Sequence, residues 1–469
     1  MTCVTHPAPA TPWLDEFRAC LALSAPLVLT NAIEMAMNLT NTAMIGRIAP
    51  EALAAATLAL ALYNVVLLFG IGLTAAVSSL IAREVGRGDG TEAARRVVQG
   101  GFWNAAMIVG PIWAVLWQTE PILCALGQDP VLSHEAAGYL HVMQWSLLPA
   151  LVYLVLRSML AALQRPRWAV MTGLAAVMLN AVLNAVLIGG AGPLPALGLA
   201  GSGLAMVLSN LFLAAALGLA VTLDARLRAV RPFAGLLRPP WRACRSLWRL
   251  GLPIGIGIML EAGMFTAAAA LVGHFDKGSL AAHAIALQVA SFAFMVPLGI
   301  AQAATVRVGR AAGAGDRAAV GRAGWTALAF GVGTMVISSA VLVGLPRPII
   351  GLFLDAASPG AGAVVQTAVT LLALAALFQI ADGAQVVLAG ILRGLQDTRT
   401  PMLIAGIGYW GIGLPLAAAL APRGAAPGIW IGLVAGLFVA AGLLLARWLS
   451  WRRNGRPESA AVRNATSSP

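Results

Sequence analysis

The stretch LALSAPLVLTNAIEMAMNLTNTAMIG, residues 21–46, decides the fold. It is long enough to cross a bilayer, because about 20 consecutive apolar residues span the hydrocarbon core as a helix. Similar runs recur along the chain of 469 residues, of which 59% are hydrophobic and only 10% are charged. The runs do not alternate with period two, as strands of a membrane barrel would, so the sequence predicts an all-α integral membrane protein.

Hydropathy predicts twelve membrane-spanning helices, with proline, glycine and charge clusters as their boundaries. The spans lie at residues 18–43, 53–81, 97–118, 134–160, 168–190, 198–222, 247–272, 281–307, 322–344, 362–390, 402–421 and 427–450. An arginine-rich segment divides them into two sets of six. We expect a cytoplasmic N-terminal tail (1–17), an N-lobe of spans 1–6 (18–222), a basic cytoplasmic linker (223–246), a C-lobe of spans 7–12 (247–450) and a cytoplasmic, disordered tail (451–469).

The basic residues cluster on one side of these spans. When both termini are placed on that side, only Arg47, Lys277, Arg347 and Arg423 fall on the other. The positive-inside rule therefore predicts that both termini are cytoplasmic. Topology accounts for the net charge of +12, so we expect a lipid bilayer and no nucleic acid as partner. A basic loop on anionic lipid headgroups is the first interpretation of the linker, and a regulatory or ligand site is the alternative.

The two halves of the chain repeat one another. A shift of 227 positions aligns Pro26 with Pro253, Glu34 with Glu261, Gly72 with Gly299, Arg83 with Arg310 and Gly86 with Gly313. An even number of spans per copy inserts both copies in the same orientation, so we expect lobes related by a pseudo-two-fold axis along the membrane normal. Such lobes favour alternating access, although channels and some membrane enzymes are also duplicated.

Three acidic residues lie well inside the predicted spans: Glu34, Glu261 and Asp382. A carboxylate at mid-span costs about 2.5–3.5 kcal/mol on insertion scales, so we expect each to be paired, protonated, hydrated or bound to a cation. The alternative is a protonated carboxyl group that hydrogen-bonds between helices. Glu261 and Asp382 are the candidates for binding a coupling ion.

Amide side chains accompany the acids. Asn31, Glu34, Asn38 and Asn41 step by three, four and three residues and therefore share one helix face. For these asparagines, interhelical hydrogen bonding and cavity lining are equally open.

Further polar residues lie in spans five, eight and ten. Gln379 and Gln385 flank Asp382, and Gln288 is a further candidate for cavity lining. Asn180 and Asn184 lie one turn apart, a pattern more typical of packing contacts. His283 begins span eight, where a lone histidine is more often solvated or capping than a proton relay.

Sequence motifs of catalysis are absent from the chain. The sequence contains no GxxxxGK[ST] nucleotide-binding loop, no HExxH and no GxSxG. We therefore expect neither an enzyme nor transport powered by the chain's own ATP hydrolysis. A membrane-embedded enzyme would need a nucleophile or metal constellation near mid-span, and the sequence offers none.

Five stretches together carry a family resemblance that covers nearly all of residues 20–450. They are APLVLTNAIEMAMNLTNTAMIGR, LPIGIGIMLEAGMF, LAAHAIALQVASFAFMVPLGIAQAATVRVG, LFQIADGAQVVLAGILRGLQDTRTP and YWGIGLP. In this order they resemble the multidrug and toxic compound extrusion (MATE) transporters, in particular the NorM-like branch. The resemblance implies a monomeric secondary antiporter of a bacterial inner membrane that exports organic cations in exchange for Na⁺ or H⁺, with no other cofactor.

The resemblance also assigns roles to individual residues. Family carboxylates that bind Na⁺ or a proton in the C-lobe match Glu261 and Asp382, and the family's polar pair in span five matches Asn180 and Asn184. A family aspartate of the N-lobe matches Asn41, which cannot take up a proton, so Glu34 on the same helix face is the candidate substitute. These four residues, Glu34, Asn41, Asn180 and Asn184, form the candidate N-lobe site. A tyrosine of some members appears as Phe378, which removes one possible cation ligand.

One rival lies within the same superfamily. A flippase of lipid-linked precursors would line its cleft with cations that bind pyrophosphate, whereas the clearest charges inside these spans are acids.

Overall fold

The computed structural model describes residues 13–190, 195–236, 238–354 and 361–453. The described residues form helices and connecting turns, without a strand. The first half contains α1 (Trp13–Ile45), α2 (Pro50–Arg87), α3 (Gly90–Leu116), α4 (Thr119–Ala125), α5 (Pro130–Met143), η1 (Gln144–Ser146), α6 (Leu147–Ala162), α7 (Arg167–Gly189), α8 (Gly198–Leu223) and η2 (Arg228–Val230). The second half contains α9 (Trp241–Gly273), α10 (Lys277–Gly313), α11 (Arg317–Gly344), α12 (Pro346–Ile350), α13 (Ala361–Gly394), α14 (Arg399–Ala405), the π-helical η3 (Gly406–Gly413) and α15 (Leu414–Arg453).

Aspartate caps begin several of these helices. The side chains of Asp129, Asp276 and Asp316 accept hydrogen bonds from backbone N–H groups in the first turns of α5, α10 and α11. Each satisfies amide groups that have no partner within the helix. Helix formation thus starts where a polar loop ends and an apolar run begins.

Ten helices of the described chain are long and apolar enough to span a membrane, or eleven if the bent pair α3–α4 is one span. The last of the ten, residues 399–453, is 55 residues long. At about 1.5 Å per residue it would extend roughly 80 Å, more than twice a hydrocarbon core of about 30 Å. Its backbone leaves the helical region at Ala425, where φ is 45° and ψ is −131°.

Close glycine contacts show that this stretch is a hairpin. A Cβ atom at Gly432 would lie 2.3 Å from the Ala417 nitrogen, and one at Gly436 would lie 2.7 Å from the Gly413 Cα atom. These contacts pair residues symmetrically about the break at Ala425, so the two halves run antiparallel. The hairpin contributes two spans and completes the twelve-helix fold that the sequence predicts.

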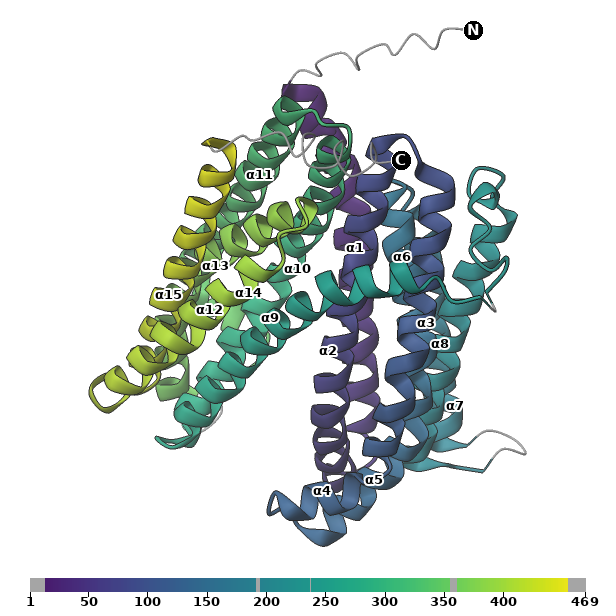
Figure 1. The fold of residues 1–469 in the computed structure, drawn as a ribbon. Coiled ribbons are helices and arrows are strands. Elements are labelled where there is room, and N and C mark those ends of the chain that lie inside the picture. Colours follow the sequence, from purple (N-terminus) through teal and green to yellow (C-terminus); the bar gives the residue numbers. More distant parts are fainter. Residues whose placement is uncertain (1–12, 191–194, 237, 355–360, 454–469) are drawn as a thin grey trace, which may run out of the picture.

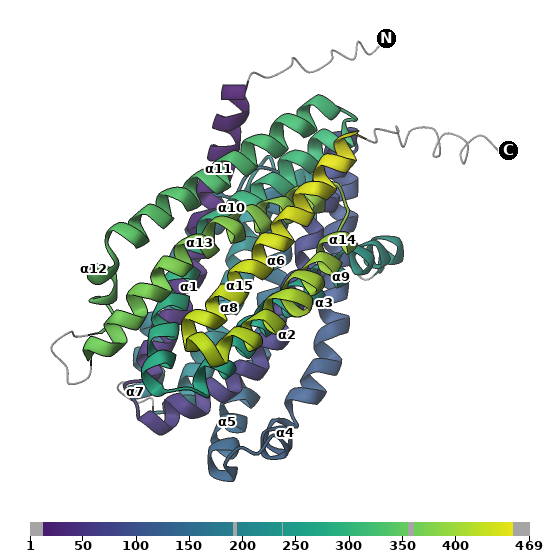
Figure 2. The same cartoon turned by 90° about the vertical axis from the view of Figure 1, so that its left-hand side faces the viewer.

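Two helical bundles make up the molecule (Figure 1), with α1–α8 in one and α9–α15 in the other. They meet near the end of the molecule that carries the start of α1 and the end of α15, and they separate towards the opposite end. The orthogonal view shows the C-terminal bundle in front, with α15 beside α13 and α9 (Figure 2).

Contacts between the lobes follow the sequence repeat. A Cβ atom at Gly86 would lie 2.1 Å from the Arg310 carbonyl oxygen, and one at Gly313 would lie 2.0 Å from the Arg83 carbonyl oxygen. The 227-residue shift exchanges these two contacts with each other. The same shift maps the contact between Gly72 and Gly255 onto the contact between Gly299 and Val28. This pairwise exchange is what a pseudo-two-fold axis between the lobes requires.

Several helices extend beyond the predicted spans. α1 begins at Trp13, α9 begins at Trp241 inside the predicted linker, and α15 continues to Arg453. Hydropathy detects only the apolar part of a helix, whereas backbone hydrogen bonding continues through the polar residues that follow. The remaining parts of the two predicted tails, residues 1–12 and 454–469, lie outside the described residues.

Candidate functional site

The structure brings the two acids of the C-lobe together. Glu261 on α9 and Asp382 on α13 lie close enough to interact electrostatically. Asp382 is only 7% exposed and its Oδ1 atom has no hydrogen-bond partner, whereas Glu261 is half-buried. Tyr409 lies within the field of both acids, and the positive charge of Arg393 acts on Glu261. Two carboxylates from different helices thus share one site inside the lobe.

Two amides surround Asp382 as the sequence predicts. Gln379 accepts a hydrogen bond of 2.8 Å from the Ser338 hydroxyl through Oε1, and its Nε2 atom has no partner. The Oε1 atom of Gln385 is also buried without a partner. Buried polar groups are nearly always paired with protein, water or ligand, so these are the atoms that a further polar partner at the site would bind.

The residues present fit a monovalent cation or a proton. The described chain contains no group of three or more His, Cys, Asp or Glu side chains that could hold a metal ion. Na⁺ would therefore need the oxygens of Glu261 and Asp382 together with an amide oxygen such as that of Gln385, because hard cations take oxygen ligands. A proton needs only one carboxylate.

An aromatic wall lies beside this acidic site. Phe378 is buried and packs edge-on against Trp430, with ring centroids 5.7 Å apart. The Trp430 indole N–H donates to Nδ1 of His283 at 3.0 Å. His283 is 2% exposed, so the expectation of a solvated or capping histidine is wrong. Its partner lies 147 residues further along the chain, beyond the reach of local sequence patterns. Gln288 is half-buried on α10 and takes no part in this network.

The N-lobe contains a buried amide cluster. Asn184 Nδ2 donates to Asn41 Oδ1 at 2.7 Å and to Asn180 Oδ1 at 3.1 Å, and Asn180 Nδ2 donates to the Ser209 hydroxyl at 3.1 Å. The cluster joins α1, α7 and α8, and all four side chains are buried. Three of the four residues predicted for the N-lobe site therefore meet. None of the three carries a titratable group.

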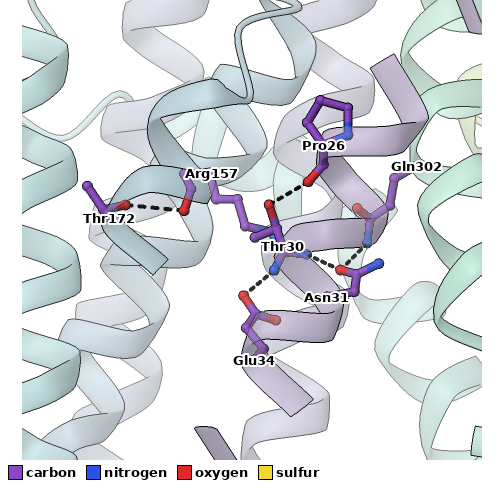
Figure 3. Close-up of polar contacts among 8 residues, drawn as sticks. Pro26, Thr30, Asn31, Glu34, Arg157, Thr172 and Gln302 are labelled. Carbon is purple, nitrogen blue, oxygen red and sulfur yellow. Dashed lines mark hydrogen bonds and ion pairs between the residues drawn. The ribbon is translucent and has the colours of Figure 1, made fainter. Parts of the chain in front are cut away.

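Glu34, the fourth, lies in a different cluster (Figure 3). Its carboxylate forms an ion pair with Arg157 of α6, and Arg157 also donates to Asn31 Oδ1 at 3.1 Å. Asn31 Oδ1 accepts a second hydrogen bond of 3.4 Å from Gln302 on α10, across the lobe boundary. Asn38, on the same face of α1, is exposed. The polar face of α1 thus divides between an ion-pair cluster and an amide cluster.

Arg157 is the residue that sequence reasoning missed. The positive-inside count places it at a cytoplasmic helix end, but its side chain is only 11% exposed and lies within α6. A guanidinium stays charged inside a protein, so burial requires a counter-charge. The apolar run LVYLVLRSMLAAL contains a single arginine, and Glu34 is the single acid well inside the N-lobe spans, so this was the signal that could have paired them.

Two repeat-related lobes of six spans each, with carboxylates and amides buried between their helices, define the class of duplicated multi-pass membrane proteins. The chain belongs to the MatE family, whose model matches residues 26–186 and 253–419. The two matched segments begin 227 residues apart, which is the shift of the internal repeat.

The curated relatives and solved structures agree with this membership. The chain is 48% identical over 453 residues, 96% of this chain and 97% of the relative, to "Probable multidrug resistance protein NorM" of Mesorhizobium japonicum. It is 44% identical to the protein of the same name from Brucella suis, over 94% of each chain. Its fold matches an outward-facing MATE family transporter of the MOP superfamily with a TM-score of 0.84, at 19% identity, over 96% of this chain and all of that one. The resemblance to NorM-like MATE transporters is therefore confirmed.

Proposed function

We propose that the chain is a multidrug efflux transporter that exports organic cations in exchange for Na⁺ or H⁺ by alternating access. Membership in the family and the name of its relatives support the efflux of small molecules. The observation that supports the coupling is that Glu261 and Asp382 lie within electrostatic range of each other, and that Oδ1 of Asp382 and Oε1 of Gln385 have no hydrogen-bond partner. A buried acidic site attracts a cation, whether that cation is the driving ion or the substrate.

Coupling follows from the charge of this site. A ligand shifts the equilibrium between inward and outward forms only by its differential affinity for them. If the ion and the organic cation stabilise different forms, entry of one drives release of the other. One charge that moves down 100 mV supplies about 2.3 kcal/mol, enough to concentrate a substrate roughly 50-fold when coupling is tight.

We assign coupling to the C-lobe alone. The N-lobe cluster of Asn41, Asn180 and Asn184 can ligate a cation but cannot take up a proton. Glu34 does not join that cluster, and Arg157 balances its charge. Glu34 therefore does not replace the missing N-lobe aspartate as a proton site in this proposal.

The orientation completes the proposal. The distribution of arginines supports cytoplasmic termini in a bacterial inner membrane, where the protein acts as a monomer. Gly86 and Gly313, which form contacts between the lobes, lie in the last turns of α2 and α10, and these helices end where α1 begins and α15 ends. With that end in the cytoplasm, the structure represents the form that is closed to the cytoplasm.

The two rivals are less well supported. A flippase of pyrophosphate-linked lipids needs free cations between its lobes, whereas the buried Arg157 is held by Glu34 and Asn31. A membrane enzyme has no support, because the family and the curated relatives are transporters.

Flux measurements on liposomes test the function. The purified protein is reconstituted, a Na⁺ gradient or a pH gradient is imposed separately, and the movement of a fluorescent organic cation is followed. We expect one of the two gradients to drive flux against the concentration gradient of the dye. If neither gradient moves any organic cation, and the protein instead transfers a lipid-linked pyrophosphate, the function is that of the flippase and the proposal is wrong.

A further inference from the structure

A basic pocket lies where the start of α3 meets the linker and the start of α9. Its volume is about 710 Å³. Arg95 and Arg96 of α3, Arg238 of the linker and Arg242 of α9 line it, with Glu92 as the one acid. Four guanidinium groups and one carboxylate leave three uncompensated positive charges.

Half of these arginines have no internal partner. Glu92 Oε1 accepts from Arg95 at 2.8 Å and from Arg96 at 3.0 Å, so one carboxylate serves two guanidinium groups. The exposed side chains of Arg238 and Arg242 form no hydrogen bond or ion pair with another residue of the described chain. The pocket therefore presents guanidinium donors that no acceptor of the described chain uses and that are available to an anion from outside the protein.

Hydrogen bonds hold the walls of the pocket in place. Gln99 donates to the Ala234 carbonyl at 2.6 Å, Trp103 donates to the Leu236 carbonyl at 2.8 Å, and Asn104 donates to the Cys244 carbonyl at 3.2 Å. The linker thus lies fixed along the N-lobe before α9 crosses to the other lobe (Figure 1). A preformed pocket loses little conformational freedom when it binds.

The first turn of α9 adds to the attraction for an anion. Trp241, Arg242 and Ala243 form this turn and also line the pocket, and no side chain caps the helix. Free N–H groups and the helix dipole at such a terminus favour negative charge. Trp241 is 63% exposed, and exposed tryptophans gather at the headgroup level of bilayers.

We propose that this pocket binds the phosphate of an anionic phospholipid headgroup. Guanidinium groups bind phosphate through paired N–H donors, which suits Arg238 and Arg242. A lipid fits better than a free anion because the pocket opens beside Trp241 on a protein that is embedded in a bilayer. The bound headgroup links α3, the linker and α9 at one point. The proposal is independent of which molecules the protein transports.

Native mass spectrometry of the detergent-solubilised protein tests this site. The protein is titrated with phosphatidylglycerol, with phosphatidylcholine and with inorganic phosphate. The pocket variant is Arg238→Gln/Arg242→Gln, and the matched control is Arg226→Gln/Arg228→Gln, which removes the same charge from exposed linker positions outside the pocket. The Arg238→Lys/Arg242→Lys variant keeps the charge but loses the paired donors.

We expect the wild type to retain phosphatidylglycerol in preference to phosphatidylcholine. The pocket variant weakens this binding about tenfold or more, the lysine variant weakens it less, and the control leaves it nearly unchanged. Equal weakening in the pocket and control variants would show diffuse surface charge and overturn the site. Binding of inorganic phosphate as tight as that of the lipid would overturn the assignment to a headgroup. If the wild type retains phosphatidylglycerol and phosphatidylcholine equally, that result alone would overturn the proposal.

Discussion

At the residue scale, the acids inside the membrane differ in whether a positively charged side chain neutralises them. Glu34 is neutralised by Arg157, whereas Asp382 keeps an oxygen without a hydrogen-bond partner. The sequence predicts the three acids because a carboxylate in an apolar run is costly wherever it lies. It does not predict which acid is paired, because Arg157 lies 123 residues away from Glu34 and near the end of a predicted span.

The Glu34–Arg157 pair allows a test of this balance. Glu34→Gln leaves a buried guanidinium without its counter-charge, so we expect a loss of about 3 kcal/mol in the free energy of unfolding. The double variant Glu34→Gln/Arg157→Gln loses less than the sum of the two single variants. Equilibrium unfolding in micelles measures both.

The matched control is Glu84→Gln, whose partner Arg87 is 50% exposed. An exposed pair of this kind contributes about 0–1 kcal/mol, so the control should unfold almost as the wild type does. Strictly additive losses in the double variant would contradict the account of Glu34 as a neutralised acid.

Asp224, between α8 and η2, gives a second prediction at this scale. The Trp168 indole N–H donates to its carboxylate at 2.9 Å, the Arg226 backbone N–H donates at 2.9 Å, and these bonds lower the pKa of Asp224 to about 2. A carboxyl group whose pKa is lowered by folding stabilises the fold above its unfolded pKa of about 3.9. That contribution disappears as the pH falls through the folded value.

Asp224→Asn should therefore remove part of the acid sensitivity. We expect the apparent melting temperature of the wild type to fall between about pH 4 and pH 2 more steeply than that of the variant. Trp168→Phe removes the strongest donor and should shift the curve in the same direction. Identical pH profiles for all three proteins would show that Asp224 does not contribute.

At the element scale, hydropathy with proline, glycine and charge boundaries predicts the helices and the loops between them, but not every interruption within a span. The break at Ala425 lies between the predicted spans 402–421 and 427–450, and Pro422 and Pro427 flank it. The sequence predicts one span at residues 134–160, and it does not reveal that the 3₁₀ turn η1 divides this span into α5 and α6. The repeat aligns Gly86 with Gly313 and Arg83 with Arg310, but that these residues contact one another across the lobe boundary is shown only by the structure.

Those glycines allow the third prediction. A Cβ atom added by Gly86→Ala meets the Arg310 carbonyl, and one added by Gly313→Ala meets the Arg83 carbonyl. We expect either substitution to move the lobes apart at this end by roughly 1 Å or more, since packed backbones do not compress. Spin labels at Thr91 and Ala318, which are exposed and repeat-related, report the distance between the lobes.

Gly442→Ala is the control, because a Cβ atom there meets nothing within 4 Å. It should leave the label distance unchanged. If Gly86→Ala and Gly313→Ala also leave it unchanged, the close approach of α2 and α10 does not hold this end of the lobes together.

At the scale of the whole molecule, the duplication explains both the architecture and its asymmetry. The lobes share their fold and their contacts, but the N-lobe pairs Glu34 with Arg157 and buries a separate amide cluster, whereas the C-lobe has two interacting carboxylates. The positions of Glu261 and Asp382 could be predicted from the sequence and the family resemblance. Their electrostatic interaction could not, since it depends on where the folded lobe places α9 relative to α13.

The central claim is that these two carboxylates couple the driving ion to export. The most direct measurement is gradient-driven flux of a fluorescent organic cation in liposomes for the wild type, Asp382→Asn, Glu261→Gln and the control Glu84→Gln. We predict that the effective gradient drives flux in the wild type and the control, and that each of the two site variants loses at least about 90% of it, as removal of a coupling charge requires. Gradient-driven flux that persists in Asp382→Asn and Glu261→Gln would contradict the account.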